Sequence, residues 1–389
     1  MKLNDDLIAK FCCGCGLCDN FSHGVVDSKG YYRPSNKTLR SGFDFSTCYA
    51  SQLNSIEPNS YWGHVDKAFL GYSNNEEIRK KASSGGILTE ITRFLLSEGI
   101  VDEVLSIRTS DGSFIKTDRV WQTDSNDCVK YSGSKYTASS SLIGFIKHVD
   151  FNKKYAVIAK PCDIRVLRTF INKNPEYKDP VRFLFSFFCG GTPSYQANVK
   201  LLNRMGLEEK ELKSFRYRGN GWPGLTSGTD VSGHTSSIEY ETSWGQILGR
   251  DIQEICRFCW EGVGEAADIS CGDGWYLEGN APSFEERDGR NIILSRSEAG
   301  TKLLSLMQER GVIHLESFSD FESLKKMQPG QFTRKASMFS RVLAMRIMHK
   351  DTPNYRLSDL LPYAKDLDLK TNLRMFVGTI KRVLQGKIK

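Results

Sequence analysis

The sequence predicts an α/β protein with a parallel or mixed sheet, a cysteine-bearing segment before it and a helical tail after it. Strand-like apolar segments alternate with segments of helical periodicity in the middle of the chain, as in sheets joined by crossover helices. Eight cysteines fall into two sets of four, one near the start and one dispersed. The last 65 of the 389 residues carry 15 Lys and Arg against 4 Asp and Glu. Three regions are therefore expected, at residues 1–55, 61–315 and 325–389.

The elements expected in the middle region follow one another along the chain. Apolar residues recur at helical spacing in residues 87–98, 142–149, 164–171 and 195–205. Short apolar runs predict strands at residues 101–107, 155–159, 181–188 and 292–294. Residues 54–60 have the composition of a linker, and the Gly-, Ser- and Thr-rich residues 216–249 predict loops and short strands. After about residue 328 the chain turns mainly helical.

The first cysteine set opens the chain in the run Cys12-Cys13-Gly14-Cys15-Gly16-Leu17-Cys18, with Cys48 further on. Thiolates at a C-x2-C-x2-C spacing hold an iron–sulfur cluster from one short loop, and glycines let the backbone curl around it. Zinc is the competing metal, since two C-x2-C pairs make a tetrahedral site. A third cysteine at the same spacing is one more than such a site needs. The expected cluster ligands are Cys12, Cys15, Cys18 and Cys48, with Cys13 as a spare.

The second set consists of Cys162, Cys189, Cys256 and Cys259. Cys162 and Cys189 each follow an apolar strand, which places them at the carboxyl edge of the predicted sheet, where ligands gather in open α/β sheets. Cys256 and Cys259 form a C-x2-C pair in a loop. These residues alone leave a cluster and zinc equally open, and buried structural cysteines are the plain alternative. Two further cysteines look like spares, Cys128 and Cys271.

Two turns rich in glycine and serine are candidates for holding a phosphate. Ser83-Ser84-Gly85-Gly86 lies directly before the helix expected at 87–98, and a helix N-terminus offers bare N–H groups to an anion. An ordinary N-cap is the alternative, because the run is neither a Rossmann nor a Walker motif. Gly133-Ser134-Lys135-Tyr136 also precedes an expected helix, and its lysine and tyrosine suit a diphosphate or a flavin edge.

Composition limits the class of protein. A hydrophobic share of 39% with 11% aromatic residues indicates a folded globular chain, and no apolar run is long enough to span a bilayer. The start, Met1-Lys2-Leu3-Asn4-Asp5-Asp6, has no signal-peptide core, so a cytoplasmic location without disulfides is expected. No histidine pair, Ser/His/Asp arrangement or carboxylate pair stands out, which suits a protein whose cofactors carry the chemistry.

Seven motifs in one order resemble the coenzyme F420 hydrogenase/dehydrogenase beta-subunit family, which includes the beta subunits of deazaflavin-reducing hydrogenase and the plant 7-hydroxymethyl chlorophyll a reductase. The resemblance runs from about Cys12 to about Leu304. Its motifs are Cys12-x-x-Cys15-x-x-Cys18, Ala82-Ser83-Ser84-Gly85-Gly86, Gly133-Ser134-Lys135-Tyr136, Pro161-Cys162, Cys189-Gly190-Gly191-Thr192-Pro193-Ser194, Arg216-Tyr217-Arg218-Gly219 with Gly221-Trp222-Pro223-Gly224, and Cys256-Arg257-Phe258-Cys259 with residues 267–273.

The resemblance implies 4Fe–4S clusters in the two cysteine sets, FAD in the region 61–315, and passage of electrons between clusters and a redox substrate. The chain departs from the family in three places. The first cysteine run lacks the usual following Cys-Pro, so Cys48 supplies the expected fourth ligand. Lys160 stands where Thr usually precedes Pro-Cys, and Cys271 stands where an aliphatic residue is common.

The predicted function is an iron–sulfur flavoprotein oxidoreductase. It would take electrons from a ferredoxin-like donor or a partner redox subunit and pass them through clusters and FAD to a small organic substrate, or run in reverse. Two alternatives stay open: a non-catalytic electron-transfer subunit that serves another enzyme, and a zinc-stabilised binding protein. No nucleic-acid partner is expected.

The tail needs an explanation of its own, because residues 325–389 carry a net charge of +11 and the other 324 residues carry −4. Apolar and basic residues interleave in residues 332–350 and again in residues 372–387. The plain interpretation is helices packed on the body with a solvated basic face. The functional interpretation is docking onto an acidic electron donor or onto anionic lipid.

Overall fold

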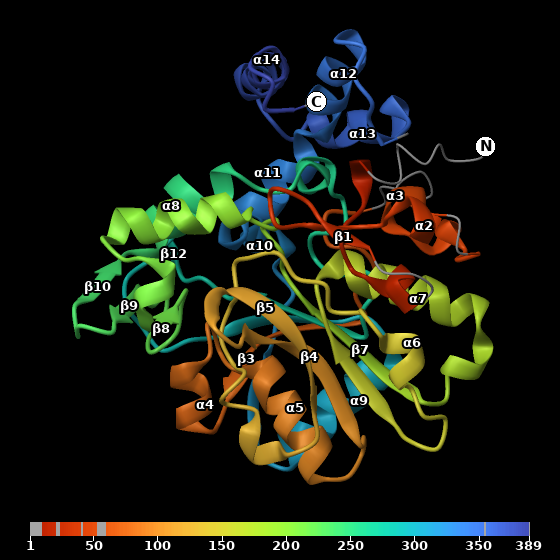
Figure 1. Ribbon diagram of the computed structural model, residues 1–389, viewed down its shortest axis with the longest axis vertical. Helices are drawn as coiled ribbons and strands as arrows, with labels where there is room; N and C mark the ends of the chain where they lie inside the picture. Colours follow the sequence, from red (N-terminus) through yellow and green to blue (C-terminus); the bar gives the residue numbers. More distant parts are fainter. Residues whose placement is uncertain (1–9, 21–23, 40–41, 53–59, 354, 389) are drawn as a thin grey trace.

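The computed structural model describes residues 10–20, 24–39, 42–52, 60–353 and 355–388, so nearly all of the expected linker at 54–60 lies outside it. A sheet that includes β3, β4, β5 and β7 forms the centre of the molecule (Figure 1). It has eight strands in the order β15-β3-β14-β11-β7-β6-β4-β5. The neighbours β4, β6, β7 and β11 run parallel, and antiparallel strands extend the sheet on both sides. The predicted mixed α/β fold is confirmed. The strands are β3 (Lys67–Ser73), β4 (Glu103–Ser110), β5 (Ser113–Gln122), β6 (Tyr155–Ile158), β7 (Val181–Phe187), β11 (Ile269–Asp273), β14 (Asn291–Ser295) and β15 (Ile313–Ser317).

Helices cover both faces of this sheet. On one face, α5 (Ile87–Ser97) and α9 (Glu298–Glu309) share a buried cluster with Ala156 and Phe185. On the other face, α7 (Pro161–Lys173) shares a cluster with Val157 and Leu184. Successive strand residues point to opposite faces, so the adjacent residues Ala156 and Val157 belong to different layers.

The described residues of the N-terminal segment pack against α7 rather than forming a core of their own, since Leu17 and Tyr49 belong to the same buried cluster as Val166. Figure 1 shows this red and orange segment beside α7. Its elements are η1 (Leu17–Asn20), β1 (Val25–Val26), β2 (Tyr32–Arg33), α2 (Asn36–Leu39), η2 (Phe45–Thr47) and α3 (Tyr49–Gln52).

A second, three-stranded sheet follows α8 (Tyr195–Met205) and has the order β10-β9-β8. It confirms the short strands predicted in residues 216–249, whereas the π-helix η6 (Glu241–Ile247) that follows was not predicted. The strands of this sheet are β8 (Leu212–Arg216), β9 (Thr226–Asp230) and β10 (Thr235–Ile238). The remaining short elements of the body are α4 (Glu76–Lys81), η3 (Ser125–Asp127), η4 (Pro175–Tyr177), η5 (Glu209–Glu211), η7 (Leu248–Arg250), η8 (Glu254–Phe258), β12 (Leu277–Glu278) and β13 (Ala281–Pro282).

Most of the expected helices lie where the periodicity put them, and α8 has the predicted bounds. The helix expected at 142–149 is wrong in extent, because only α6 (Phe145–His148) is helical. Gly144, directly before it, has φ of 70°, a left-handed conformation that cannot belong to a right-handed helix. None of the helices in the described residues is both long and apolar enough to cross a bilayer.

The tail is helical as predicted, and α12, α13 and α14 gather at one end of the molecule, at the top of Figure 1. Its helices are α10 (Phe321–Met327), α11 (Pro329–Ala336), α12 (Met338–Ile347), α13 (Leu357–Ala364) and α14 (Leu369–Leu384).

Lys335 of α11 anchors the tail to the body and is only 2% exposed. Its Nζ donates to Glu265 Oε1 and to the Tyr61 carbonyl, both at 2.7 Å, and lies 5.0 Å from the centre of the Trp260 ring. Burial lowers the pKa of Lys335, and the neighbouring Glu265 carboxylate opposes that shift.

We predict that Lys335→Met lowers the free energy of unfolding by about 3–5 kcal/mol, because Glu265 would be left as a buried charge without its partner. Urea denaturation followed by circular dichroism measures the loss. Lys326→Met, the same exchange at an exposed position of α10, is the control and should change stability by less than about 0.5 kcal/mol. Equal losses in the two variants would contradict the anchoring role.

Candidate functional site

A cavity of about 510 Å³ lies at the carboxyl edge of the parallel strands. The ends of β6, β7 and β11, the N-terminus of α5 and the segment 131–141 line it. This is the edge at which open α/β sheets bind their ligands. The volume falls within the range of about 300–1,000 Å³ that is usual for small-molecule sites.

The two predicted phosphate turns meet at this cavity, since the Ser134 N–H donates to Ser83 Oγ at 2.6 Å. Residues of both turns line it: Ser83, Ser84, Gly86, Gly133, Ser134, Lys135 and Tyr136. The second turn does precede a helix, but α6 begins only at Phe145, so this turn does not lie at a helix N-terminus.

Gly85, predicted to face the phosphate, is not among the residues that line the cavity. A Cβ atom at this position would lie 2.7 Å from the Gly71 carbonyl oxygen and 2.8 Å from the Asn291 nitrogen. Glycine is therefore required for the close approach of the turn to β3 and β14, and a side chain here would disturb the fold before it reached a ligand.

The cavity wall near these turns is positive. Leu88 and Thr89, in the first turn of α5, line it, and first-turn N–H groups have no acceptor within their own helix. Lys135 Nζ donates to the carbonyls of Tyr131 at 2.8 Å and Gly133 at 3.2 Å. Burial, assisted by the charge of Arg216, lowers the pKa of Lys135 to about 8. Lys135 and a helix N-terminus make this corner a fit for a diphosphate.

An aromatic wall lies further along the cavity. Arg218, 2% exposed, forms a two-point ion pair with Asp273, with both N···O distances at 3.0 Å. Its guanidinium also lies 4.6 Å from the Tyr240 ring and 5.3 Å from the Trp275 ring. The sequence reasoning assigned none of these residues, although the motif that contains Arg218 was visible. The fixed rings suit a flat conjugated ligand.

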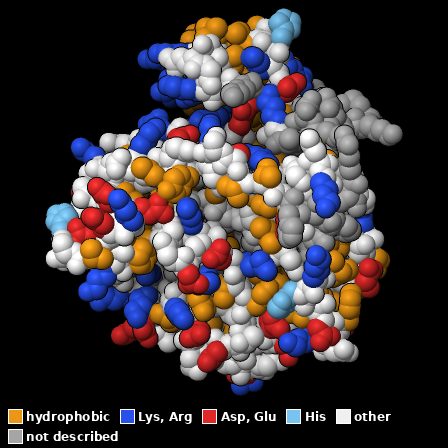
Figure 2. All heavy atoms as spheres, viewed as in Figure 1, with side chains coloured by type: hydrophobic (Ala, Val, Ile, Leu, Met, Phe, Trp, Pro, Cys, Tyr) orange, Lys and Arg blue, Asp and Glu red, His pale blue; other side chains and the backbone are white. Residues whose placement is uncertain are grey.

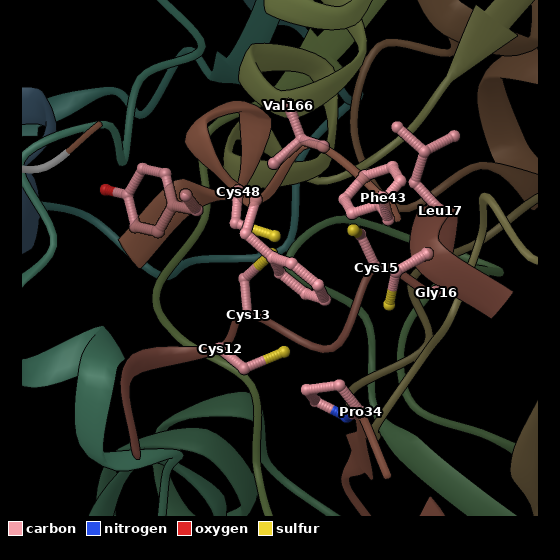
Figure 3. Close-up of a pocket in the computed structure, with 12 residues that line it drawn as sticks. Cys12, Cys13, Cys15, Gly16, Leu17, Pro34, Phe43, Cys48 and Val166 are labelled. Carbon is pink, nitrogen blue, oxygen red and sulfur yellow. The ribbon is translucent and has the colours of Figure 1, made fainter. Parts of the chain in front are cut away.

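Five thiols surround a second, much smaller cavity between the N-terminal segment and α7 (Figure 3). They are Cys12, Cys13, Cys15, Cys18 and Cys48. The other lining side chains are mainly apolar, among them Phe43 and Val166. All four predicted ligands of the first set are thus brought together, with Cys13 among them.

Burial raises the pKa of Cys12 to about 11 and of Cys18 to about 12, with neighbouring thiols adding to the shift. These thiols therefore stay neutral at pH 7 unless a bound metal cation stabilises the thiolates. The affinity of such a set for a metal therefore depends on how readily the thiols release their protons. This donor set fits a thiolate-ligated metal centre.

The second set is partly assembled. The Gly191 N–H donates to Cys189 Sγ and the Thr192 N–H to Cys256 Sγ, both at 3.4 Å. Burial raises the pKa of Cys256 to about 11, and the nearby Cys189 acts in the same direction. Burial is also the main cause that raises the pKa of Cys259. The nearby Cys256 and Cys189 add to this shift, and the charge of Arg334 opposes it. Three of the four predicted ligands are therefore neighbours, and backbone donors already point at two of the sulfurs.

Cys162, the fourth predicted ligand, is the second residue of α7 and follows β6, as Cys189 follows the adjacent parallel strand β7. The expected placement at one sheet edge is confirmed. The thiol of Cys162 lies against Cys13, and their hydrogen bond is the main cause that raises the pKa of Cys162.

Cys13 is the site residue that sequence reasoning missed. Hydrogen bonds with Cys15 and Cys162 hold the pKa of its thiol well below the usual range. Cys13 also forms a group with Cys15 and Asp163 whose ligand atoms lie within 4.8 Å of one another. The one signal in the sequence was the place of Cys13 inside the cysteine run. That signal could not show that Cys13 contacts Cys162, which lies 149 positions later.

The two cysteine sets are contiguous through two contacts. The first is the contact between Cys13 and Cys162. The second is Tyr49, which lines the first thiol cavity and whose hydroxyl lies 3.0 Å from Cys259 Sγ. Cys189 in turn lines the large cavity. A continuous series of packed groups thus joins the N-terminal thiols to the large cavity.

Arginines enclose the second set on the side of the tail. Arg334 donates to the carbonyls of Cys189 and Gly190, both at 2.9 Å, and Arg341 donates to the Arg257 carbonyl at 3.1 Å. Burial lowers the pKa of Arg341 to about 9, and the charges of Arg334, Arg382 and Arg257 act in the same direction. Within the described residues, Arg334 and Arg341 form no salt bridge. An anionic group at the adjacent thiols would relieve this repulsion.

Two family models match the chain, and both describe the "Coenzyme F420 hydrogenase/dehydrogenase, beta subunit". Residues 68–147 match the model of its N-terminal part, and residues 152–320 match the model of its C-terminal part. Together the two matches span well over half of the chain. The helices α10 to α14 lie outside them.

Individual proteins agree with this match. The coenzyme F420 hydrogenase subunit beta of Methanothermobacter thermautotrophicus is 22% identical over 289 residues, which are 72% of this chain and 95% of that protein. The F420-dependent formate dehydrogenase subunit beta of Methanocaldococcus jannaschii is 26% identical over 262 residues, 65% of this chain and 62% of that protein. A chain from a xenon-derivatised F420-reducing NiFe hydrogenase complex of Methanosarcina barkeri superposes with a TM-score of 0.54 at 20% identity. The superposition covers 73% of this chain and 96% of the hydrogenase chain, and it shows that the two share a fold.

Proposed function

The chain belongs to the coenzyme F420 hydrogenase/dehydrogenase beta-subunit family, and from this we propose that it is an iron–sulfur flavoprotein oxidoreductase. The observation that carries the proposal is the contiguity of its parts. The first cysteine set contacts the second through Cys13 and Tyr49, and the second borders the large cavity through Cys189. Electron transfer needs such a series of adjacent centres, whereas a zinc-stabilised binding protein does not.

The proposed cluster ligands are Cys12, Cys15, Cys18 and Cys48 in the first set and Cys162, Cys189, Cys256 and Cys259 in the second. The packing of the thiols favours clusters over zinc. Tetrahedral Zn–S bonds of about 2.3 Å would hold the four sulfurs roughly 3.8 Å apart. In the described residues, the one group of three metal-type ligand atoms that lie within 4.8 Å of one another is Cys13, Cys15 and Asp163, not either predicted set. The thiolates of a cluster bind different irons and stand further apart.

The proposed FAD site is the large cavity, with the diphosphate at the corner formed by Ser83, Ser134, Lys135 and the start of α5. Lys135 supplies the positive charge there, and the Ser84 hydroxyl already donates to the Arg290 carbonyl at 2.8 Å, which fixes the turn. The rings beside Arg218 would hold the flat part of the flavin or of the substrate. When bound, the clusters carry single electrons, and the flavin joins one-electron to two-electron chemistry.

The electron donor is proposed to be a ferredoxin-like protein or a partner redox subunit, and the substrate a small organic molecule. The named relatives are subunits of hydrogenases and formate dehydrogenases, which favours a second candidate, a non-catalytic subunit that serves a partner enzyme.

Both candidates require bound iron–sulfur clusters and flavin, and the absorption spectrum of anaerobically purified protein tests for these cofactors. A colourless zinc protein would overturn both candidates. Turnover of a dithionite-reduced sample with added organic acceptors separates the enzyme from the adapter.

Replacing one thiol of the second set should remove one cluster. We expect the wild type to hold about eight irons per chain and Cys256→Ser about four, because each 4Fe–4S cluster depends on its thiolates. Iron analysis after anaerobic purification measures the difference. Cys128→Ser, which removes a buried cysteine outside both sets, is the control and should keep the full iron content. The assignment is wrong if Cys256→Ser retains as much iron as the control.

Lys135→Met should weaken FAD binding by about tenfold or more, because a charge-assisted contact to phosphate would be lost. Burial lowers the pKa of Lys135 to about 8, so wild-type affinity should fall as pH rises from 7 to 9.5 and the ammonium loses its proton. The variant should show no such fall. Flavin fluorescence titration measures both, with exposed Lys130→Met as the control. A pH profile of the variant that parallels the wild type would exclude this role of Lys135.

Arg334→Met should make the reduction potential of the second cluster more negative by about 50–100 mV, equivalent to roughly 1–2 kcal/mol for one electron. The reason is that a nearby positive charge stabilises the reduced, more anionic centre. A redox titration monitored by electron paramagnetic resonance measures the potential. Arg334→Lys keeps the positive charge, so its potential should stay close to that of the wild type. If Arg334→Met keeps both its iron and its potential, the arginine serves packing alone.

A further inference from the structure

Helix α14 presents a row of aliphatic side chains to solvent. The exposed fractions are 85% for Leu369, 58% for Leu373, 52% for Val377 and 73% for Leu384. Their spacings of four, four and seven residues put them on one side of the helix. Six of the twelve exposed large hydrophobic side chains among the described residues lie between 347 and 384. This stretch is about a tenth of the chain, so the exposure is concentrated rather than scattered.

The aliphatic row is not the side by which α14 packs on the tail. The buried residues Thr379 and Val383 mark the packed side. Asn372 Oδ1 accepts a hydrogen bond from Ser340 Oγ at 2.9 Å, which joins α14 to α12. Met375 Sδ, on the same side, lies 3.9 Å from Arg341. The packed side and the aliphatic row are therefore distinct, and nothing in the described chain covers the row.

Positive charge borders the row. Lys370, Arg374 and Lys381 are exposed along one flank of α14. From residue 369 to residue 389 the sequence has six Lys and Arg and no Asp or Glu. Figure 2 shows Lys, Arg and hydrophobic side chains side by side over the C-terminal helices at the top of the molecule.

We propose that α14 docks on an anionic membrane surface. A helix with an aliphatic side and flanking Lys and Arg lies in the interface plane, with the apolar side at the acyl boundary. The long stems of Lys370, Arg374 and Lys381 would let their charges reach the lipid phosphates. Each such cation near an anionic leaflet strengthens binding about fivefold.

The charges and side-chain types argue against the other occupants. A second copy of the chain would bring two such cationic flanks together, which like-charge repulsion disfavours. Nucleic acid would leave the aliphatic row uncovered. A protein partner is disfavoured because the row contains none of the Trp and Tyr anchors that dominate protein hot spots.

The docking face lies outside the part of the chain that the family models match, since α14 lies beyond residue 320. It is also close to the second cysteine set. α14 packs on α12, and Arg341 of α12 donates to the carbonyl of Arg257, the neighbour of Cys256. Docking by α14 would therefore hold the cysteine centres near the lipid surface.

Vesicle flotation of the full chain tests the proposal and does not depend on bound cofactors. The chain should float with vesicles of phosphatidylcholine containing 30% phosphatidylglycerol at low salt, and not with phosphatidylcholine alone. Leu373→Gln with Val377→Gln should reduce partitioning tenfold or more. Lys370→Gln, Arg374→Gln and Lys381→Gln together should reduce it about a hundredfold. All five side chains are exposed, so the fold should survive.

Leu225→Gln with Val231→Gln, at positions 50% and 71% exposed in the body, is the matched control and should float like the wild type. The proposal fails if the wild type does not float with the anionic vesicles or if the control loses as much binding as the α14 variant. It also fails if the wild type is retained by polyglutamate beads without floating, which would indicate an acidic protein partner. A wild-type dimer in light scattering that the leucine–valine variant dissociates would indicate a second copy instead.

Discussion

A thiolate is costly to hold in an apolar interior unless a cation neutralises it, and this constraint bears on both cysteine sets. The N-terminal thiols face phenylalanine, leucine and valine side chains, and burial raises the pKa of Cys12 and Cys18. The backbone N–H groups of Gly191 and Thr192 already point at the sulfurs of the second set. The surroundings of both sets thus suit thiols that lose their protons only when a metal binds.

The tail supplies a further part of that balance. Arg334 reaches the carbonyl of Cys189, and Arg341 lies between Arg334, Arg257 and Arg382 without a carboxylate partner among the described residues. Like charges held close together without a counter-charge cost free energy, so the convergence of these arginines near Cys189, Cys256 and Cys259 supports the anionic centre proposed there. Arg334 and Arg341 lie beyond residue 320, where the family match ends.

The strongly periodic parts of the fold could be predicted from the sequence, and the weakly patterned parts could not. α5, α7 and α8 and the parallel strands β4, β6 and β7 are dense in apolar residues, and they lie where expected. β11, with the sequence Ile-Ser-Cys-Gly-Asp, and β5, with its charged residues, have no such signal and owe their conformation to their neighbours in the sheet. Spacing predicted the first cysteine set, and strand-end positions with a C-x2-C pair predicted the second, but neither could predict the contact of Cys13 with Cys162, which depends on how α7 packs.

The way in which the N-terminal segment is buried has a consequence for the order in which the protein matures. Four of its five cysteines lie in or against a single buried cluster with α7, with Trp260 and with Val383 of the tail. The described residues of the segment form no separate core that could hold these thiols in place during synthesis. A metal centre at these thiols, as proposed, would therefore be completed only after the middle of the chain and the tail have packed around them. Metal binding would then be a late step that links the beginning of the chain to its end.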